Sequence, residues 1–313
     1  MRSSAVSVVI PAYNAETTIS EQLDALLDQD TSVSWELIVC DNGSTDRTRD
    51  IVADYLPRFA SARLVDASLR RGPAAARNAG AREATGRWLL FCDADDVVDR
   101  SWISDHVAAL RGANLVVGDV EYDRLRPRAT PALSWLRSGP LVFRLPALPW
   151  LDGAGSGNIS VEREVFLEAG GFEERLRTAE DADLVWRLQL SGIELVRGGG
   201  TCHIRVRHSF RALARQAFGY GAVYKMLDHR YARVRAAHGE PGESGAADDA
   251  ESALARARSN LYRGLRRLLA FGDSQKWADI TWGFSHRLGQ ILGPTMQLPQ
   301  VLPDGRIGVD GER

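Results

Sequence analysis

Cysteine is scarce in this sequence, and the few cysteines present are not spaced like disulfide partners or metal ligands. The three cysteines, Cys40, Cys92 and Cys202, have neither paired spacing nor a C-x-x-C arrangement. Two of them end short apolar runs, which is typical of buried strand residues. A disulfide framework is therefore not expected, and the pattern suits a reducing compartment.

Long apolar runs and a large net charge are also lacking. No segment approaches the roughly 18 consecutive apolar residues expected of a membrane span. The first predicted strand begins within a few residues of the N-terminus, which leaves no room for a secretory signal. Lys and Arg number 39 against 41 Asp and Glu, so the formal net charge is −2 and nucleic acid is not the expected partner. We expect a cytoplasmic protein, with peripheral contact at the inner membrane face left open.

The sequence does contain alternating strand and helix patterns. Residues 6–10 (VSVVI) form a β-branched run that Pro11 is expected to stop, and apolar residues then recur at helical spacing from Ile19. The same alternation continues, with further strands predicted at 35–40, 63–66, 87–92, 114–120 and 201–207, and helices at 46–55, 74–84, 102–110, 162–169 and 181–190. Short connections between such elements predict an α/β fold with a doubly wound, mostly parallel sheet. These sheets bind ligands at the carboxyl ends of their strands.

An acidic cluster, Asp93-Ala94-Asp95-Asp96, directly follows the fourth predicted strand. Neighbouring carboxylates raise one another's pKa unless a cation lies among them. A hard divalent ion such as Mn²⁺ or Mg²⁺, bound by one or two carboxylates and by phosphate oxygens, meets that need. The alternative is a solvated turn in which Asp99 caps the next helix.

Four short motifs carry a resemblance to a known family. They are residues 8–14 (VVIPAYN), 41–46 (DNGSTD), 76–80 (ARNAG) and the D-x-D segment 93–96 (DADD). In this order and spacing, the first half of the chain resembles the large inverting GT-A glycosyltransferase family, the family-2-type group. The resemblance implies a GT-A doubly wound mixed sheet and metal-dependent transfer of a sugar from a nucleotide diphosphate sugar to an acceptor hydroxyl by direct displacement.

The resemblance also implies a nucleotide pocket. Pro11, Tyr13 and Asn14 would line it, with the Tyr13 ring bordering the base. Asp41 matches an aspartate that accepts the N–H of uracil or thymine, which favours a UDP- or dTDP-sugar. Asp41 can equally be a turn or capping residue. The family more often has a second aspartate where Asn42 stands.

Further positions match residues around the phosphates. Arg77 would border the nucleotide and offer paired donors to a phosphate oxygen, or it is an exposed helix arginine. Asp93 would lie beside the donor, and Asp95 would bind the metal ion. His203 matches a histidine that completes the metal site in some relatives, and the alternative is a strand histidine bonded to backbone.

The segments 157–160 (GNIS), 170–172 (GGF) and 180–183 (EDAD) resemble the acceptor half of the family. Asp181 shares a helical stripe with Leu184 and Leu188, so it belongs to the first turn of an inward-facing helix, where the helix dipole favours its ionised form. The resemblance implies that Asp181 is the catalytic base. The alternative is an ordinary first-turn carboxylate.

The C-terminal part is less characteristic. A stripe of leucines and arginines between residues 254 and 269 predicts a basic amphipathic helix, which could lie on a membrane, pack on its own domain or form a homodimer. We expect a glycosyltransferase domain at 1–235 (nucleotide-sugar half 1–122, acceptor half 123–235), a linker at 236–252, a helical extension at 253–298 and a disordered tail at 299–313.

Two other functions compete with the glycosyltransferase hypothesis. A nucleotidyltransferase would carry a glycine-rich basic loop after its first strand, and Pro11 to Asn14 has neither property. A non-catalytic sugar-nucleotide-binding protein would be expected to lack Asp95 or Asp181, and both are present. The acceptor class, whether a glycan, a lipid-linked sugar or a small molecule, stays open.

Overall fold

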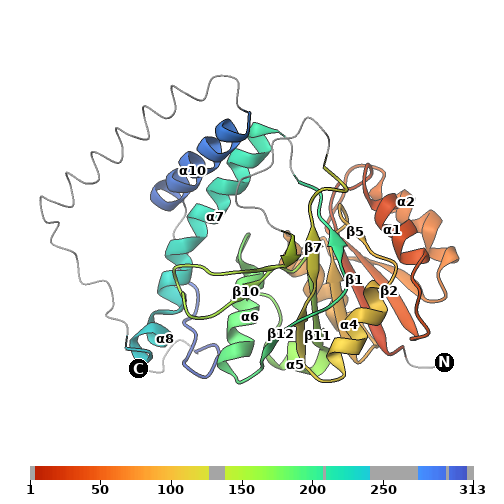
Figure 1. The fold of residues 1–313 in the computed structure, drawn as a ribbon, viewed down its shortest axis with the longest axis horizontal. Coiled ribbons are helices and arrows are strands. Elements are labelled where there is room, and N and C mark those ends of the chain that lie inside the picture. Colours follow the sequence, from red (N-terminus) through yellow and green to blue (C-terminus); the bar gives the residue numbers. More distant parts are fainter. Residues whose placement is uncertain (1–3, 127–137, 207–208, 240–273, 294–295, 309–313) are drawn as a thin grey trace, which may run out of the picture. The chain divides into compact units, whose positions relative to one another are not determined.

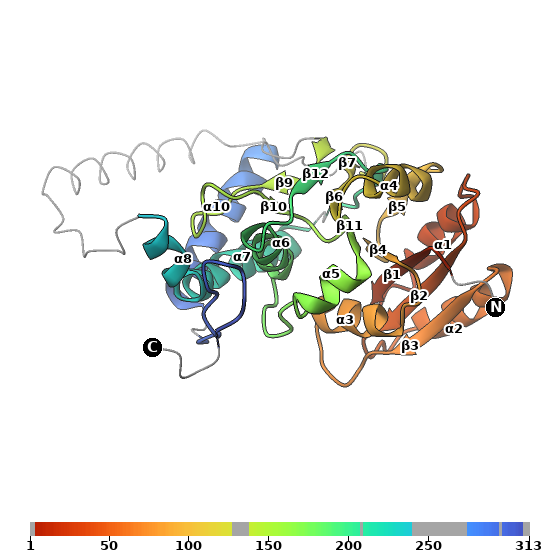
Figure 2. The same ribbon diagram turned by 90° about the horizontal axis from the view of Figure 1, so that it is seen from below.

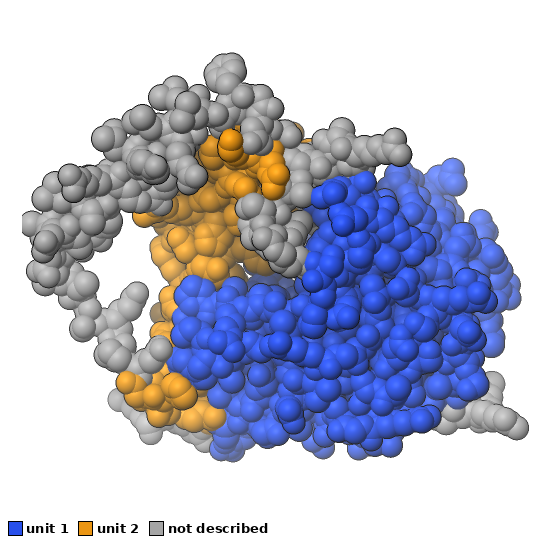
Figure 3. All heavy atoms as spheres, viewed as in Figure 1, with its two compact units in different colours: residues 1–126, 137–206, 304–307 blue, residues 127–136, 207–303, 308–313 orange. Residues whose placement is uncertain are grey.

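The computed structural model describes residues 4–126, 138–206, 209–239, 274–293 and 296–308. Contacts divide the chain into two compact units (Figure 3). Unit 1 is residues 1–126, 137–206 and 304–307, and unit 2 is residues 127–136, 207–303 and 308–313. The border follows Val206, whereas the sequence placed it at residue 235. The expected linker from residue 240 onward and the basic stripe at 254–269 lie outside the described residues.

A seven-stranded sheet forms the centre of unit 1 (Figure 1). Its strands, in spatial order, are β12 (Leu195–Arg197), β6 (Leu115–Val117), β11 (Asn158–Glu162), β4 (Trp88–Cys92), β1 (Val6–Ala12), β2 (Trp35–Asp41) and β3 (Ala62–Asp66). All neighbouring pairs are parallel except those of β11, which runs antiparallel to both β4 and β6. The predicted doubly wound, mostly parallel mixed sheet is confirmed.

Helices cover both faces of this sheet because alternate strand residues point to opposite sides. Val8 and Ile10 of β1 join one apolar cluster, and Val9 joins the other. The first cluster lies under α1 (Ile19–Leu27), α2 (Thr48–Tyr55) and α4 (Trp102–Leu110), and the second under α3 (Pro73–Glu83), α5 (Arg163–Glu168) and α6 (Glu180–Leu190). A short 3-10 helix, Leu56–Arg58, follows α2.

Strand β1 does not stop before Pro11, as the sequence suggested, but continues to Ala12. The physical reason is that β1 pairs with β4 only from Val6 to Val9, while its pairing with β2 extends to Ala12. Pro11 therefore lies where one side of the strand has no ladder partner, and its missing N–H costs nothing.

The strand expected at 114–120 is two strands that separate at Gly118. Strand β6 stays in the large sheet, while β7 (Asp119–Glu121) joins a second sheet. A Cβ at Gly118 would overlap Asn158 Nδ2 and the Gly200 carbonyl, so the bend needs glycine. The second sheet has the order β5 (Val97–Val98), β13 (Cys202–His203), β7 and β8 (Gly139–Pro140), and β9 (Val142–Phe143) pairs separately with β10 (Gly153–Ala154).

Unit 2 contains the helices α7 (Phe210–Arg230), α8 (Ala232–Ala237) and α10 (Ser274–Leu292). Helices α7 and α10 lie side by side (Figures 1 and 2) and approach closely at glycines. A Cβ at Gly221 would overlap the His286 carbonyl, and one at Gly289 would overlap that of Phe218. None of the described helices combines the length and apolar character that crossing a bilayer requires.

Part of the tail that composition marked as disordered has definite contacts within unit 2. Val301 is fully buried, and its N–H donates to the Arg230 carbonyl at 2.7 Å. The buried Arg230 side chain in turn donates to the Pro299 carbonyl at 2.9 Å. These contacts hold the segment around Val301 against α7, although its composition alone predicts disorder.

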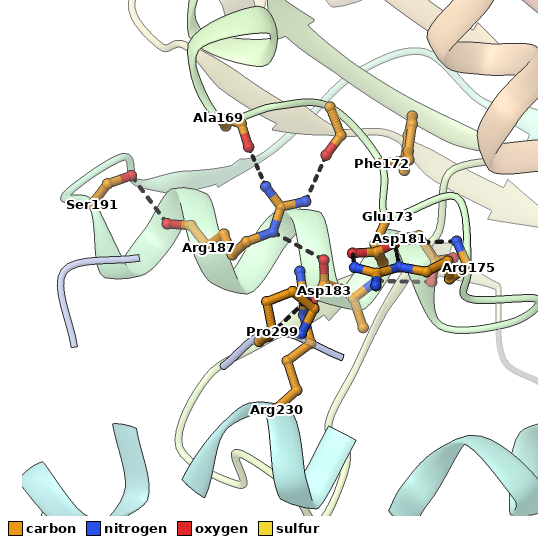
Figure 4. A network of polar contacts seen from close by, with 12 residues as sticks. Ala169, Phe172, Glu173, Arg175, Asp181, Asp183, Arg187, Ser191, Arg230 and Pro299 are labelled. Atoms are coloured by element: carbon orange, nitrogen blue, oxygen red, sulfur yellow. Dashed lines mark hydrogen bonds and ion pairs between the residues drawn. The ribbon is translucent and has the colours of Figure 1, made fainter. Parts of the chain in front are cut away.

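A buried arginine fixes helix α6 to the end of α5 (Figure 4). Arg187 donates to Asp183 Oδ2 at 2.9 Å, to the Gly171 carbonyl at 2.6 Å and to the Ala169 carbonyl. Its side chain is 2% exposed and that of Asp183 is fully buried. The guanidinium therefore pairs with a buried carboxylate and also satisfies two backbone carbonyls just beyond the C-terminus of α5.

Replacing Arg187 by Leu should lower the free energy of unfolding by about 3–5 kcal/mol, because it removes the buried cation that pairs with the fully buried Asp183 carboxylate. Chemical denaturation followed by circular dichroism measures this loss. Arg58→Leu is the control, because its ion pair with Asp24 is exposed on both sides, and it should change stability by at most about 1 kcal/mol. Equal effects of the two substitutions would contradict the account.

Candidate active site

The loops after β1 and β2 meet at the carboxyl edge of the sheet. Parallel pairing places Ala12 beside Asp41, so the residues that follow each strand are neighbours. The Asn14 N–H donates to Ser44 Oγ at 3.0 Å, and Asn14 Oδ1 accepts from the Thr45 N–H at 2.8 Å. Asn14 has a left-handed backbone with φ of 48°, which asparagine tolerates better than most residues. It joins the two loops rather than facing away from them.

Tyr13 lies at this edge of the sheet, and its ring is exposed to solvent. Its side chain is 51% exposed, which is unusual for a large aromatic residue at a buried strand end. The Arg71 guanidinium lies over the ring at 5.9 Å from its centroid. The ring is accessible for stacking, and the preceding Pro11 is half-buried in the same edge.

Asp41 is held within its own turn. It accepts from the Gly43 and Ser44 amides at 3.3 Å and pairs with Arg49 at 2.9 Å, with 1% of its side chain exposed. The turn role weighed in the sequence is therefore present. Asn42 Nδ2 donates to the Ala67 carbonyl at 2.6 Å, a bond that an aspartate could not make. The departure from the family pattern thus has a structural reason.

The acidic cluster lies where β4 ends. One ligand oxygen from each of Asp93, Asp95 and Asp96 can be chosen so that all lie within 4.8 Å of one another. Asp96 is buried, and burial raises its pKa well above the usual range, with the charges of Asp95 and Asp93 adding to the effect. The buried Gln22 of α1 donates to the Asp93 carbonyl, and the Arg205 N–H donates to Asp96. Neighbouring elements therefore fix the cluster.

Arg77 connects this cluster with helix α6. Its Nη2 contacts Asp93 Oδ1 at 2.5 Å, and its Nη1 contacts Glu180 Oε1 at 3.2 Å. The side chain is 4% exposed and lies over the Phe172 ring at 5.6 Å. Its Nε has no hydrogen-bond partner. The exposed-arginine alternative is therefore wrong, and Arg77 is a buried link between two acidic groups.

The dipeptide Ser156-Gly157 lies between Asp181 and the acidic cluster. The Ser156 N–H donates to Asp181 Oδ2 at 3.2 Å, while a Cβ at the next residue, Gly157, would lie 3.1 Å from Asp93 Oδ2 and 3.7 Å from Asp96 Oδ2. This proximity follows from sheet pairing, because Asn158 of β11 is opposite Cys92 at the end of β4. The structure therefore brings Asp181 and the acidic cluster to one site.

Two neighbouring carboxylates at the start of α6 affect each other. Burial, and then the charge of Asp181, raise the pKa of Glu180 to about 7, although Arg77 opposes the shift. Burial also raises the pKa of Asp181, against the backbone amides of Ala182 and Ser156. The preceding Ala179 has a left-handed φ of 59°, so the helix entrance is strained.

His203, which the resemblance assigned to the metal site, contacts two carboxylates outside the acidic cluster. Its Nε2 contacts Asp99 Oδ1 and its Nδ1 contacts Glu121 Oε2, both at 2.8 Å. Among the residues that the structure describes, the group that could share a metal ion consists of Asp93, Asp95 and Asp96 and does not include His203. Neither ring nitrogen bonds to backbone, so that alternative from the sequence is wrong.

Sequence reasoning overlooked three residues of this site. Glu180 was visible as the first acid of the 180–183 segment, but nothing in the sequence indicated that Arg77 reaches it. Gln22 appeared as one polar residue on an apolar helix, and its buried amide bonds to the acidic loop. Ser156 contributes only its backbone N–H, for which side-chain patterns give no signal.

This arrangement of sheet, acidic strand end and helix defines an α/β protein with a candidate site at the carboxyl edge of its sheet, and comparison with known proteins names the family. The sequence model of glycosyl transferase family 2 matches residues 7–163. The chain belongs to this family.

Individual relatives are glycosyltransferases. The chain is 39% identical over 100 residues to the UDP-Glc:alpha-D-GlcNAc-diphosphoundecaprenol beta-1,3-glucosyltransferase WfgD of Escherichia coli, a match covering 32% of this chain and 37% of the relative. It is 31% identical over 222 residues to a validoxylamine A glucosyltransferase of Streptomyces hygroscopicus subsp. jinggangensis, covering 61% and 52%. The matches thus span a third to a half of these relatives' lengths.

A solved structure has the same fold. The mannosyltransferase PcManGT from Pyrobaculum calidifontis, in complex with GDP-Man and Mn²⁺, superimposes with a TM-score of 0.59 at 20% sequence identity. The match covers 92% of this chain and 87% of that one. The expected GT-A type of fold is confirmed.

The raised pKa of Glu180 predicts a pH dependence of stability in metal-free protein. Its folded-state pKa of about 7 exceeds the ordinary 4.5, so the folded state holds the proton more tightly. The resulting stabilisation is complete below pH 4.5 and is lost as the pH rises through 7. Glu180→Gln should therefore remove about 1–3 kcal/mol of the decline in unfolding free energy over this range, measured by chemical denaturation with a chelator. An unchanged decline in the variant would contradict the assignment.

Proposed function

We propose that this chain is a metal-dependent glycosyltransferase that moves a sugar from a nucleotide diphosphate donor to an acceptor hydroxyl with inversion. The observation that carries the proposal is the convergence of Asp181 and the acidic cluster on one dipeptide. Ser156 bonds to Asp181, and Gly157 lies against Asp93 and Asp96. A proton acceptor and a phosphate-side cluster this close together can act on the two sides of one sugar carbon.

The nucleotide would bind at the edge formed by β1 and β2. The exposed ring of Tyr13 offers a face for the base, and Pro11 and Asn14 supply the adjoining wall. Asp41 is the candidate acceptor for a uracil or thymine N–H. Because its carboxylate is occupied by its own turn and by Arg49, this contact requires a bond of that turn to be exchanged.

The donor set of the acidic cluster fits a hard divalent ion such as Mn²⁺ or Mg²⁺. The three carboxylates present only oxygen ligands, and their mutual repulsion falls when a cation lies among them. Asp95, the exposed member, would hold the ion, with Asp93 on the donor side. When bound, the ion neutralises charge on the leaving diphosphate. His203 could join only if its ring left Asp99 or Glu121.

Asp181 would act as the general base. Its carboxylate accepts the proton of the acceptor hydroxyl while that oxygen bonds to the anomeric carbon and the bond to the diphosphate oxygen breaks. A pKa above the ordinary aspartate value suits this role, since a stronger base accepts the proton more readily. Arg77 keeps Glu180 and Asp93 paired on either side, so the base and the cluster hold a fixed separation.

The acceptor is proposed at the level of a hydroxyl group. The name of the Escherichia coli relative specifies a sugar linked to diphosphoundecaprenol, and that of the Streptomyces relative specifies validoxylamine A. A lipid-linked sugar, a glycan and a small molecule are therefore the classes to screen.

Two substitutions separate the proposed roles. Asp181→Asn should lower turnover about 10²–10⁴-fold, because the proton acceptor is lost, and should leave donor affinity largely intact. Asp95→Asn should weaken the binding of Mn²⁺ and of the donor together. Titration calorimetry and the release of nucleotide diphosphate from the sugar nucleotide measure the two effects. Asp54→Asn, an exposed change on α2, is the control, and equal losses of donor affinity in the first two variants would refute the roles.

A donor panel tests the function itself. UDP-, dTDP- and GDP-sugars are screened by thermal denaturation with and without Mn²⁺, since a ligand at 100 times its Kd stabilises by about 2.7 kcal/mol. We expect a UDP- or dTDP-sugar to raise the midpoint in the presence of the metal, with slow metal-dependent hydrolysis. Stabilisation without any hydrolysis would favour the alternative, a sugar-nucleotide-binding protein.

A further inference from the structure

Helix α10 exposes large apolar side chains at intervals of seven residues. Trp277 is 42% exposed, Phe284 56% and Ile291 62%. Seven residues are close to two helical turns, so the three side chains lie in one row along the helix. Single exposed apolar residues are common on protein surfaces, whereas a row of them indicates an interaction site.

This row lies on the side of α10 that does not pack on α7. Buried residues lie on the neighbouring face: Ala278 and Ser285 each follow a residue of the row by one position, about 100° around the helix, and Ala278 shares an apolar cluster with Leu213 of α7. Packing within unit 2 therefore uses one face of the helix and leaves the row exposed. The row has no function in the proposed sugar transfer.

The described helices of unit 2 expose more positive than negative charge. Residues 209–239 and 274–293 contain eight Arg and Lys and two acidic residues, Asp228 and Asp279. Of the basic residues, Arg230 is buried and Arg235 pairs with Asp228, and the other six are exposed. On α10 itself, Lys276 and Arg287 are exposed, and helical spacing places them along one edge of the apolar row. A second copy of this face would bring like charges together, so the charge favours an anionic partner over self-association.

We propose that this face of α10 docks on the surface of an anionic lipid bilayer. The row of Trp277, Phe284 and Ile291 would enter the boundary between head groups and acyl chains, where Trp and Phe are favoured. The stems of Lys276 and Arg287 would extend toward the lipid phosphates. The helix lies along the membrane plane and does not cross it. The inference is independent of the proposed function, because it concerns residues outside the site.

Vesicle co-sedimentation of the full chain tests this docking. Wild type should bind vesicles containing about one third phosphatidylglycerol at least tenfold more strongly than pure phosphatidylcholine, and added salt should weaken the binding. The variant W277S/F284S/I291S should lose about tenfold or more of that affinity. Leu69→Ser, at a 97% exposed residue of unit 1, is the matched control and should bind like wild type.

Further measurements keep the test decisive. Phe284→Asp alone should lower binding several-fold, and it carries the test if circular dichroism shows that the triple variant is misfolded. Absent binding to anionic vesicles, equal binding to both vesicle types, or unchanged binding of the variants would overturn the proposal. Sedimentation velocity tests the alternative that this face pairs two copies of the chain. A wild-type protein that is dimeric and does not bind vesicles, together with a monomeric triple variant, would show this alternative and overturn the proposal.

Discussion

The two contacts of the Arg77 guanidinium hold the candidate site together. Asp93 belongs to the loop after β4 and Glu180 to the first turn of α6, and these segments come from distant parts of the sequence. Without a buried cation between them, their carboxylates and that of Asp181 would repel one another in a poorly solvated place. The cation allows acidic groups to gather at the sheet edge, where the proposed reaction requires both a phosphate-binding metal ion and a base.

The frame around this arginine explains why the arrangement is fixed. Asn78, the next residue of α3, exchanges two hydrogen bonds with the backbone of Phe172, at 2.8 and 2.9 Å. Arg187 fastens the preceding glycine segment to α6, so that α3, the loop and α6 form one hydrogen-bonded assembly. On the other side, antiparallel pairing of β11 with β4 carries Gly157 against the cluster. Stability and site geometry therefore depend on the same contacts.

Much of this could be predicted from the sequence, because strands and helices of a doubly wound sheet follow local apolar periodicity. The end of the fourth strand then identified Asp95 as a site candidate, and the family resemblance identified Asp181. The structure places the acidic cluster and Asp181 on either side of the dipeptide Ser156-Gly157. What the sequence could not give were contacts made by backbone and by buried polar side chains. The bend at Gly118 depends on the close approach of Asn158, and the partners of His203 come from two other segments. Such pairings are set by tertiary packing and leave no periodic signal.

In the proposed function, the carboxyl edge of the sheet in unit 1 serves both the donor phosphates and the proton transfer. Crystals soaked with Mn²⁺ and a nucleoside diphosphate test it most directly. We expect the ion on the Asp95 carboxylate, the diphosphate between the ion and the side facing Asp181, and the nucleobase beside Tyr13. An ion bound away from the 93–96 segment, or a nucleotide lying where Asp181 cannot reach the sugar, would contradict it.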